Sequence, residues 1–333
     1  MFAIQRVEGE PPVGLRQQIK RAAIAVLHRF DPSLVPTLHA AIRQPRNSHQ
    51  RLSELENAEA PQFVPPGHFY SPVPRLDEVR RRASSLYQME GAEPPGIDMR
   101  EEAQLALLQS FKPYYDEVTF PAERTPGLRY HYDNPAYGYP DAFFLHAMIR
   151  HLRPKRIIEV GSGYSSCMTL DTNERFFGNS IQCTFIEPYP KLLKELVKPE
   201  DKLDLISTGL QAVPLDRFRT LEAGDILFVD STHVVRVGSD VNHLFFSILP
   251  ALAKGVYVHL HDVFYPFEYP LPWLLEGRQW AELYLLRAFL MYNTAFEVAL
   301  MNTFLLHRHR PLMEAQFPAC CAEPFGSIWL RKV

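Results

Sequence analysis

Short apolar runs alternate with helical segments throughout the chain after Pro154, and this alternation is the feature that most constrains the fold. Apolar runs this short are typical of buried strands, and the segments between the first five are long enough to form crossover helices. Strands joined in this way run parallel and build a sheet that helices cover on both faces. The last two runs have no crossover helix beyond them, so we expect them to close the sheet as an antiparallel hairpin. We predict an α/β fold with a doubly wound, mostly parallel, seven-stranded Rossmann-like sheet, whose strands span 156–160, 182–187, 203–207, 225–230, 255–260, 296–302 and 327–332.

The part before this sheet has a different texture, because many of the 29 prolines fall there. The Pro-rich, aromatic stretch 63–74 is interpreted as an extended segment packed against the body of the protein. We therefore divide the chain into 1–136, an irregular and mainly helical N-terminal region that serves as a lid or an acceptor-binding part, and 137–333, the sheet domain. Helical periodicity predicts helices within 13–43, 76–90, 99–112 and 141–152.

Composition narrows the function classes. Hydrophobic residues make up 46% and charged residues 22%, which is ordinary for a soluble globular protein, and the formal charge of −3 provides no basic field for nucleic acid. The four cysteines form no C-x-x-C pair, and no apolar run resembles a signal peptide or a membrane span. We expect a cytoplasmic protein that binds neither nucleic acid nor membranes; a homo-oligomer is compatible with the sequence.

The first predicted strand ends in "EVGSGYSS", residues 159–166. Gly161 and Gly163 permit a sharp turn and close approach of a ligand to the backbone. A dinucleotide fingerprint would have a third glycine at 166, where Ser166 stands. Glu159 also departs from that fingerprint, because its carboxylate would repel a pyrophosphate but attract an ammonium group.

A second acid, Glu187, follows the second predicted strand, at the usual distance from the glycines for a group that accepts hydrogen bonds from ribose hydroxyls. A Gly-x-Gly alone can be no more than a tight turn between a strand and a helix. The two acids at the ends of neighbouring strands favour a nucleoside cofactor that carries an amine.

This pattern resembles the class I S-adenosylmethionine (SAM)-dependent methyltransferases of polysaccharide and natural-product pathways. The resemblance covers residues 137–333, and in that fold the last two strands also form an antiparallel hairpin. It implies that the loop after the first strand holds the methionine part of SAM and that the acid after the second strand holds the ribose. The cofactor-binding residues it implies are Glu159, Gly161, Ser162, Gly163, Tyr164, Ser165 and Glu187.

The ends of the fourth and fifth predicted strands also carry ionisable groups. In catechol O-methyltransferase and its relatives, an acid after strand four and an acid–amide pair after strand five bind a divalent metal ion. The matching positions here hold Asp230, His261 and Asp262. His261 departs from the usual oxygen ligand, and imidazole shifts the preference from magnesium towards manganese, iron, zinc or nickel. The resemblance thus implies a divalent metal ion, magnesium, manganese or iron, as a second cofactor.

Metal-free interpretations of the same residues stay open. Asp262 could cap the following segment while His261 acts as a general base or as a core histidine. His233, on the loop after the fourth strand, could take a proton from the acceptor. His259 lies deeper in its strand and is interpreted as structural. The catalytic candidates are therefore His233, His261 and Asp262.

Aromatic stretches at 129–142 and 264–282 flank these motifs and suit a sugar ring or a flat phenolic acceptor. We expect a methyltransferase that O-methylates a sugar or a small hydroxylated metabolite, with a small-molecule or glycan acceptor as its partner. The main alternative is a metal-dependent, hydroxylase-like or other non-methylating enzyme on the same fold. A NAD-linked oxidoreductase or a catalytically silent binding protein is a further alternative.

Overall fold

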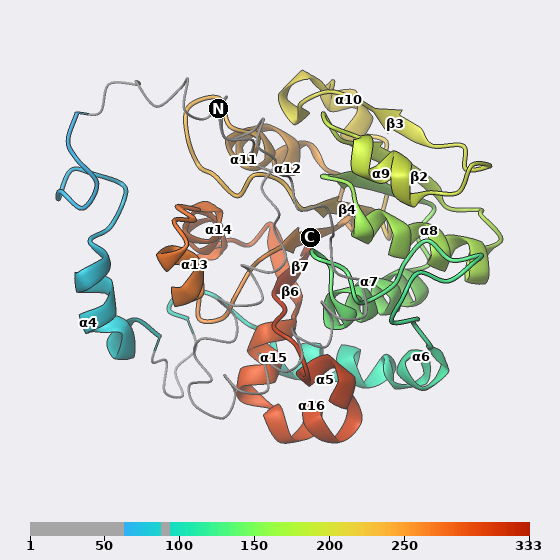
Figure 1. Cartoon of the computed structure of the whole chain (residues 1–333), viewed down its shortest axis with the longest axis horizontal. Coiled ribbons are helices and arrows are strands. Elements are labelled where there is room, and N and C mark those ends of the chain that lie inside the picture. Colours follow the sequence, from blue (N-terminus) through green and yellow to red (C-terminus); the bar gives the residue numbers. More distant parts are fainter. Residues whose placement is uncertain (1–62, 88–93) are drawn as a thin grey trace, which may run out of the picture.

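The seven predicted strands form one mixed sheet in the computed structural model, which describes residues 63–87 and 94–333 (Figure 1). The strand order is β3-β2-β1-β4-β5-β7-β6; β1 to β5 pair in parallel, and β7 runs antiparallel to both β5 and β6. This topology confirms the predicted fold class. The strands are β1 Arg156–Val160, β2 Gln182–Ile186, β3 Asp204–Ile206, β4 Ile226–Val229, β5 Tyr257–His261, β6 Phe296–Met301 and β7 Ser327–Lys332.

Central strands of the sheet are buried on both faces, which explains their continuous apolar sequences. All four residues of β4 are buried, and β4 lies between β1 and β5. Figure 1 shows α7 and α8 on one side of the sheet and α11, α12 and α14 on the other. Because β1, β4 and β5 are parallel neighbours, their carboxyl ends meet at one edge of the sheet. The predicted site residues Asp230, His261 and Asp262 lie at this edge.

The helices and helical turns fill the connections between the strands. The α-helices are α4 Leu76–Tyr87, α5 Glu101–Ser110, α6 Lys112–Glu117, α7 Tyr139–Leu152, α8 Tyr164–Phe177, α9 Lys191–Leu196, α10 Leu215–Phe218, α11 Asp240–His243, α12 Leu249–Ala251, α13 Leu271–Leu275, α14 Glu282–Leu290, α15 Asn302–Arg308 and α16 Arg310–Gln316. Short turns of other helix types are η2 Leu210–Ala212, η3 Leu244–Ile248 and η4 Pro318–Cys321. None of the helices in 63–87 and 94–333 is long and apolar enough to cross a membrane.

The N-terminal predictions have mixed outcomes. The helix predicted within 13–43 lies outside the described residues, whereas α4 lies within 76–90 and α7 covers 141–152. The helix predicted over 99–112 is divided into α5 and α6 next to Pro113, which is favoured near a helix start and disfavoured inside a helix.

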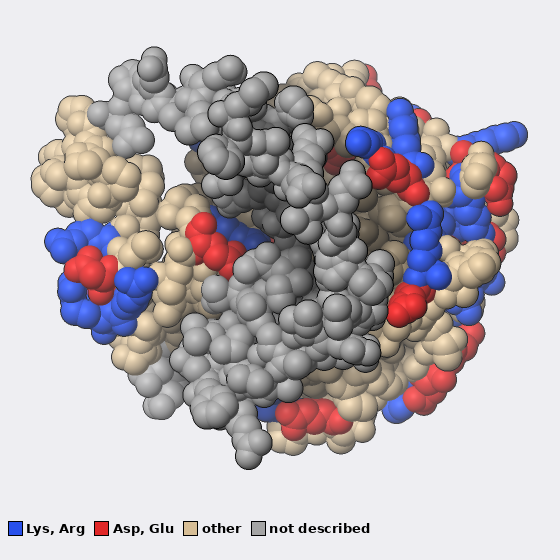
Figure 2. All heavy atoms as spheres, viewed as in Figure 1, with Lys and Arg blue, Asp and Glu red and all other residues tan. Residues whose placement is uncertain are grey.

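The prediction that 63–74 is extended and packed against the body is wrong. This segment folds into turns, with backbone bonds from Gly67 to Val73 and from Ser71 to His68. Phe69 is 81% exposed and contacts the neighbouring rings of His68 and Tyr70 instead of a core. Helix α4, at the left of Figure 1, follows this segment, and Figure 2 shows its arginines gathered around its two acids.

Residues just before α7 belong to the same hydrophobic core as the sheet. The buried guanidinium of Arg129 forms ion pairs with Asp171 and Glu174 of α8 and with Asp201. On the other side, the side chain of Gln104 in α5 accepts a hydrogen bond from the backbone of β6. The ion pairs of Arg129 hold the stretch before α7 against α8. The division at residue 136/137 stays a prediction.

A neutral histidine is buried in the interface between α7 and α8. His146 is 1% exposed, its Nδ1 lies 2.9 Å from Thr172 Oγ1, and it contacts the rings of Phe120 and Phe176. Burial, and then the charges of Arg150 and Arg175, lower its pKa to about 3. In the unfolded chain the pKa of this histidine returns to 6.5. Between the two pKa values the unfolded chain therefore binds a proton on this side chain and the folded chain does not.

We expect this histidine to weaken the fold in acid. Because the unfolded state binds more protons between the two pKa values, the free energy of unfolding falls by about 2 kcal/mol from pH 7 to pH 5 through this group. His146→Gln should lose less stability over the same interval in urea denaturation, and the exposed-histidine variant His307→Gln serves as the control. Parallel stability profiles of wild type and His146→Gln would contradict this account.

Candidate active site

The loop after β1 lies directly against the end of β4. Gly161 has φ +80°, and a Cβ atom there would lie 1.7 Å from the backbone oxygen of Asp230. The backbone N–H of Asp230 donates to Val160, and that of Gly161 donates to Ile186 of β2. A side chain at position 161 is therefore excluded by both conformation and space, and the glycine brings three strand ends together.

Glu159 is buried beneath this loop. Its Oε1 accepts hydrogen bonds of 2.7 Å from the hydroxyls of both Ser165 and Ser166, the latter standing where a dinucleotide fingerprint would have glycine. Burial raises the pKa of the Glu159 carboxyl to about 8. Its Oε2 and the buried hydroxyl of Ser162 have no hydrogen-bond partner in the described part of the chain. Unsatisfied groups of this kind fit a polar ligand that supplies the missing bonds.

Glu187 follows β2 and faces the same loop. Its two oxygens accept from the backbone N–H groups of Ser162, at 3.1 Å, and Tyr189, at 2.8 Å. Gly163 immediately precedes α8, and Tyr164 is the first residue of that helix, with its ring edge-on to His131. The structure thus brings all seven predicted cofactor residues to one loop and the strand beside it.

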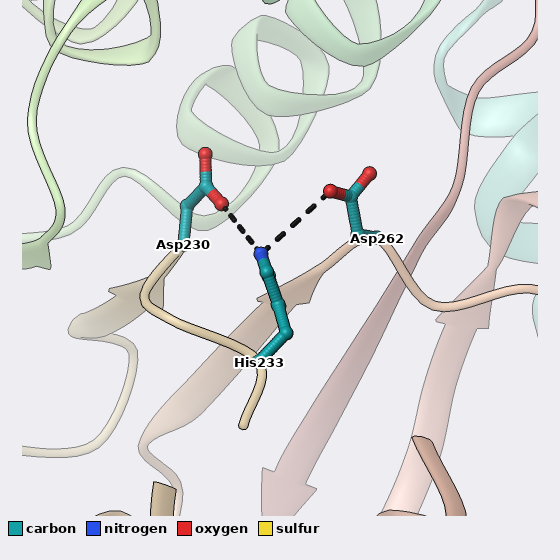
Figure 3. Close-up of side chains that lie close together, drawn as sticks. All are labelled: Asp230, His233 and Asp262. Carbon is teal, nitrogen blue, oxygen red and sulfur yellow. Dashed lines mark ion pairs between the residues drawn. The ribbon is translucent and has the colours of Figure 1, made fainter. Parts of the chain in front are cut away.

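A cluster of Asp230, His233 and Asp262 lies at the ends of β4 and β5 (Figure 3). The Nε2 atom of His233 is 3.2 Å from Asp230 Oδ1 and 3.6 Å from Asp262 Oδ2. Its other nitrogen, Nδ1, is 2.8 Å from Oε2 of Glu282, at the start of α14. Glu282 therefore fixes the imidazole through Nδ1, while Nε2 faces Asp230 and Asp262.

Two members of this cluster have unusual backbone conformations. His233 has φ +59° and Asp262 has φ +56°, in the left-handed region that residues other than glycine seldom adopt. The carbonyl of His233 accepts bonds from the backbone N–H groups of Ala281 and Glu282, which stabilise its turn. Each such residue costs about 1–3 kcal/mol, which the surrounding contacts must offset. Residues strained in this way are found mainly at functional sites.

Charge interactions dominate the cluster. Burial alone would lower the pKa of His233, but hydrogen bonds to Asp230 and Glu282 and the charge of Asp262 raise it well above its usual value. For Asp262, burial raises the pKa of the carboxyl, against the lowering effect of nearby histidines. A proton on His233 thus partly neutralises three surrounding carboxylates.

The two histidines of β5 differ from this arrangement. His261 is buried, and its Nε2 lies 3.6 Å from Asp262 Oδ1, but the group able to hold a metal ion among the described residues contains His233 instead. His259 stacks on Phe228 at 4.3 Å, and burial lowers its pKa well below the usual value. Neither ring nitrogen of His259 has a hydrogen-bond partner among the described residues.

A cavity of about 360 Å³ opens onto the cluster. Trp273 and Trp280 line one part of it, with ring centroids 5.3 Å apart, and the guanidinium of Arg278 lies over both rings. The ring of Trp280 also contacts His233, at 4.5 Å between centroids. An aromatic wall facing acids and a histidine suits a small, hydroxylated ring.

Sequence reasoning missed two acids of this site. Glu282, which holds His233, begins a helix far along the chain, and Asp141, which lines the cavity, lies in the first turn of α7. The one available signal for Asp141 was an acid opening an apolar helix, a pattern that equally indicates ordinary helix capping. No local pattern marks Glu282.

A family model described as a methyltransferase domain matches residues 158–263. The chain is 37% identical over 173 residues to an uncharacterized protein of Archaeoglobus fulgidus, a match that covers 51% of this chain and 78% of that protein.

Two solved structures are also similar to the chain. The SAH-bound methyltransferase PaMTH1 of Podospora anserina has 17% identity and a TM-score of 0.39, over 82% of this chain and 100% of that chain. The O-methyltransferase TomG of Streptomyces achromogenes, solved with SAM, has 16% identity and a TM-score of 0.35, over 77% of this chain and 96% of that chain.

The matched family model spans the glycine loop, Glu187 and the β4 and β5 ends, which carry the predicted site residues. The seven-stranded sheet with its antiparallel β6–β7 hairpin is also the one expected from the same interpretation. The chain belongs to the class I SAM-dependent methyltransferase family, and it is a methyltransferase.

Proposed function

We propose that this methyltransferase acts on a hydroxyl group of a sugar or another small hydroxylated metabolite. The observation that carries the proposal is the contact between Gly161 and Asp230, because it joins the cofactor loop to the cluster around His233. A methyl group held at that loop would lie beside the groups able to deprotonate an acceptor. Alignment of a nucleophile with the sulfonium methyl is the main requirement of methyl transfer.

Residues of the loop would hold SAM in distinct ways. The unpartnered oxygen of Glu159 suits the ammonium group of the methionine part, and Glu187 suits the two ribose hydroxyls. Gly161 and Gly163 let the backbone approach the cofactor, while Ser162, Tyr164 and Ser165 complete the loop and the start of α8.

His233 would receive the proton of the acceptor hydroxyl at Nε2. Glu282 accepts the Nδ1 hydrogen and so fixes the orientation of the ring. Because the surrounding acids raise the pKa of His233 well above its usual value, Nε2 would act as a base only at a pH high enough to leave it unprotonated. After proton transfer the imidazolium would be stabilised by Asp230 and Asp262. His261, beside Asp262, would support this charge distribution from β5.

The same cluster could also hold a divalent ion. One ligand atom each from Asp230, His233 and Asp262 lies within 4.8 Å of the others, and two carboxylates with one imidazole suit manganese or iron. The hydrogen bond that Nδ1 donates to Glu282 is the usual support for a histidine that ligates through Nε2. An ion bound there would lower the pKa of the acceptor hydroxyl.

The region before residue 137 would contribute to acceptor binding. Across a groove of about 1030 Å³, the segment with His68 and Phe69 and the helix α4 face Trp280, which also lines the cavity at the cluster. A substrate in the cavity could therefore extend towards this part of the chain. Residues 137–333 would carry the cofactor and the chemistry.

The cofactor assignment predicts a defined loss of SAM affinity. Glu187→Gln should raise the Kd for SAM about 10- to 100-fold, because charged hydrogen bonds to the ribose are lost. Isothermal titration measures this, with exposed Glu200→Gln as the matched control and NAD as the competing ligand. Binding of SAM no tighter than NAD by wild type would contradict the assignment.

The base assignment predicts a kinetic loss without a binding loss. His233→Asn should lower kcat about 10²- to 10⁴-fold while the Kd for SAM stays unchanged, because only proton transfer is affected. Glu282→Gln should lower kcat about 10- to 100-fold by loosening the imidazole. The acceptor for these assays comes from a screen of labelled methyl transfer to sugars, phenols and peptides. A His233→Asn enzyme with wild-type kcat would exclude this base.

Metal analysis tests the ion and its ligands. Wild type purified with manganese present should retain about one ion per chain. Asp262→Ala and His233→Asn should lose it, and His261→Asn should keep it if the geometry decides the ligand set. If His261→Asn loses the ion and His233→Asn keeps it, the ligand set expected from the sequence, with His261, is the right one. If wild type retains no ion, the metal site is excluded and His233 acts by proton transfer only.

A further inference from the structure

Two buried groups beside the cluster lack the partners that the other charged groups of the site have. Asp141, in the first turn of α7, is 6% exposed, and His261, the last residue of β5, is 5% exposed. Within the described part of the chain, Asp141 Oδ1 and His261 Nδ1 have no hydrogen-bond partner, and both atoms are enclosed by protein. Each would destabilise the fold by about 1–3 kcal/mol if it stayed unsatisfied.

The fold brings these two side chains to the same part of the cavity wall. The backbone N–H of Gly326 donates to the Asp141 carboxyl group, and the next residue, Ser327, pairs with His261 between β7 and β5. Tyr137 contacts both residues. Its ring centroid lies 5.2 Å from that of His261, and its hydroxyl donates to the backbone oxygen of Asp141 at 3.2 Å.

Opposite charge favours a contact between the two groups. Burial raises the pKa of the Asp141 carboxyl, and His261 is the group whose charge lowers that pKa most, whereas Asp262 and Asp230 raise it. The Nδ1 hydrogen of His261 is thus the side-chain donor whose charge suits Asp141 Oδ1. A small rotation of the carboxyl group, or one buried water between the two atoms, would complete the bond.

His233 shows the same arrangement in completed form. Its Nδ1 lies 2.8 Å from Glu282, an acid in the first turn of α14, and its Nε2 faces Oδ2 of Asp262 at 3.6 Å. His261 faces the other oxygen of this carboxylate, Oδ1, also through Nε2 and also at 3.6 Å. Asp262 therefore lies between two imidazoles, and each imidazole has an acid from the first turn of a helix near its other nitrogen.

We propose that Asp141 is a positioning residue that holds the Nδ1 hydrogen of His261 and thereby keeps Nε2 of this ring directed at Asp262. This inference rests on the proposed function, in which Asp262 stabilises the protonated His233 or binds the ion. Asp141 acts on the reaction only through His261, which fixes the Asp262 carboxylate on the side away from His233.

The nitrogen of His261 that carries hydrogen tests the proposal without any acceptor. With isotope-labelled histidine, nitrogen chemical shifts should show hydrogen on Nδ1 in wild type, whether the ring is neutral or charged. Asp141→Asn keeps the shape of the side chain, but its single oxygen stays with the N–H of Gly326 and its amide group donates, so the hydrogen should move to Nε2. His261→Asn identifies the signal by its loss. Glu102→Gln, an exposed acid in the first turn of α5, is the matched control.

Kinetics with an acceptor from the methyl-transfer screen test the route through His261. Asp141→Asn should lower kcat about 10-fold, because the support of an imidazole at the site is lost, while KM and the Kd for SAM stay unchanged. Since Asp141 acts through His261, the same substitution should have no further effect in a His261→Asn background.

Two outcomes would overturn the inference. One is hydrogen on Nε2 alone of wild-type His261, a measurement that does not depend on how Asp141→Asn folds. The other is an effect of Asp141→Asn on kcat that is absent, or that is as large in the His261→Asn background as in wild type. Hydrogen on Nδ1 together with no transfer to any acceptor would establish the bond to Asp141 and contradict the proposed function instead.

Discussion

The close approach of Gly161 to the backbone of Asp230 is the constraint on which the site depends. Because no side chain fits between them, the loop that follows β1 can lie against the end of β4, and the neighbouring strands bring Glu187 and Asp262 to the same edge. The acids of the site then originate from strand ends or, for Glu282, from the start of helix α14. Sites built in this way hold geometry more accurately than sites on free loops.

Acids outnumber bases at this edge, and their arrangement explains how the fold tolerates them. Glu159 is satisfied on one oxygen by two serine hydroxyls, while Asp230, Asp262 and Glu282 surround the single imidazole of His233. Each acid is therefore paired on one side and open on the other. Asp230 and Asp262 line the cavity, where a hydroxylated acceptor would complete the bonding, and the open oxygen of Glu159 lies beneath the cofactor loop.

Much of the fold could be predicted from the sequence, because strand positions follow from apolar runs and strand ends follow from sheet topology. That reasoning placed Asp230 and Asp262 correctly at neighbouring strand ends. It could not show that His233, with its left-handed backbone, lies between them, nor that Glu282 and Asp141 reach the site from helices, because such contacts depend on tertiary packing. The wrong prediction for 63–74 has the same origin, since aromatic content alone does not reveal what a ring contacts.

The left-handed conformations of His233 and Asp262 have a consequence for how the chain can vary. Glycine would relax both turns, so the backbone alone favours a residue without a side chain, although Asp and His tolerate this conformation better than most residues. Stability and chemistry thus make opposite demands at the same two positions. A substitution at 233 or 262 that raises the Tm of this protein is therefore expected to abolish its activity.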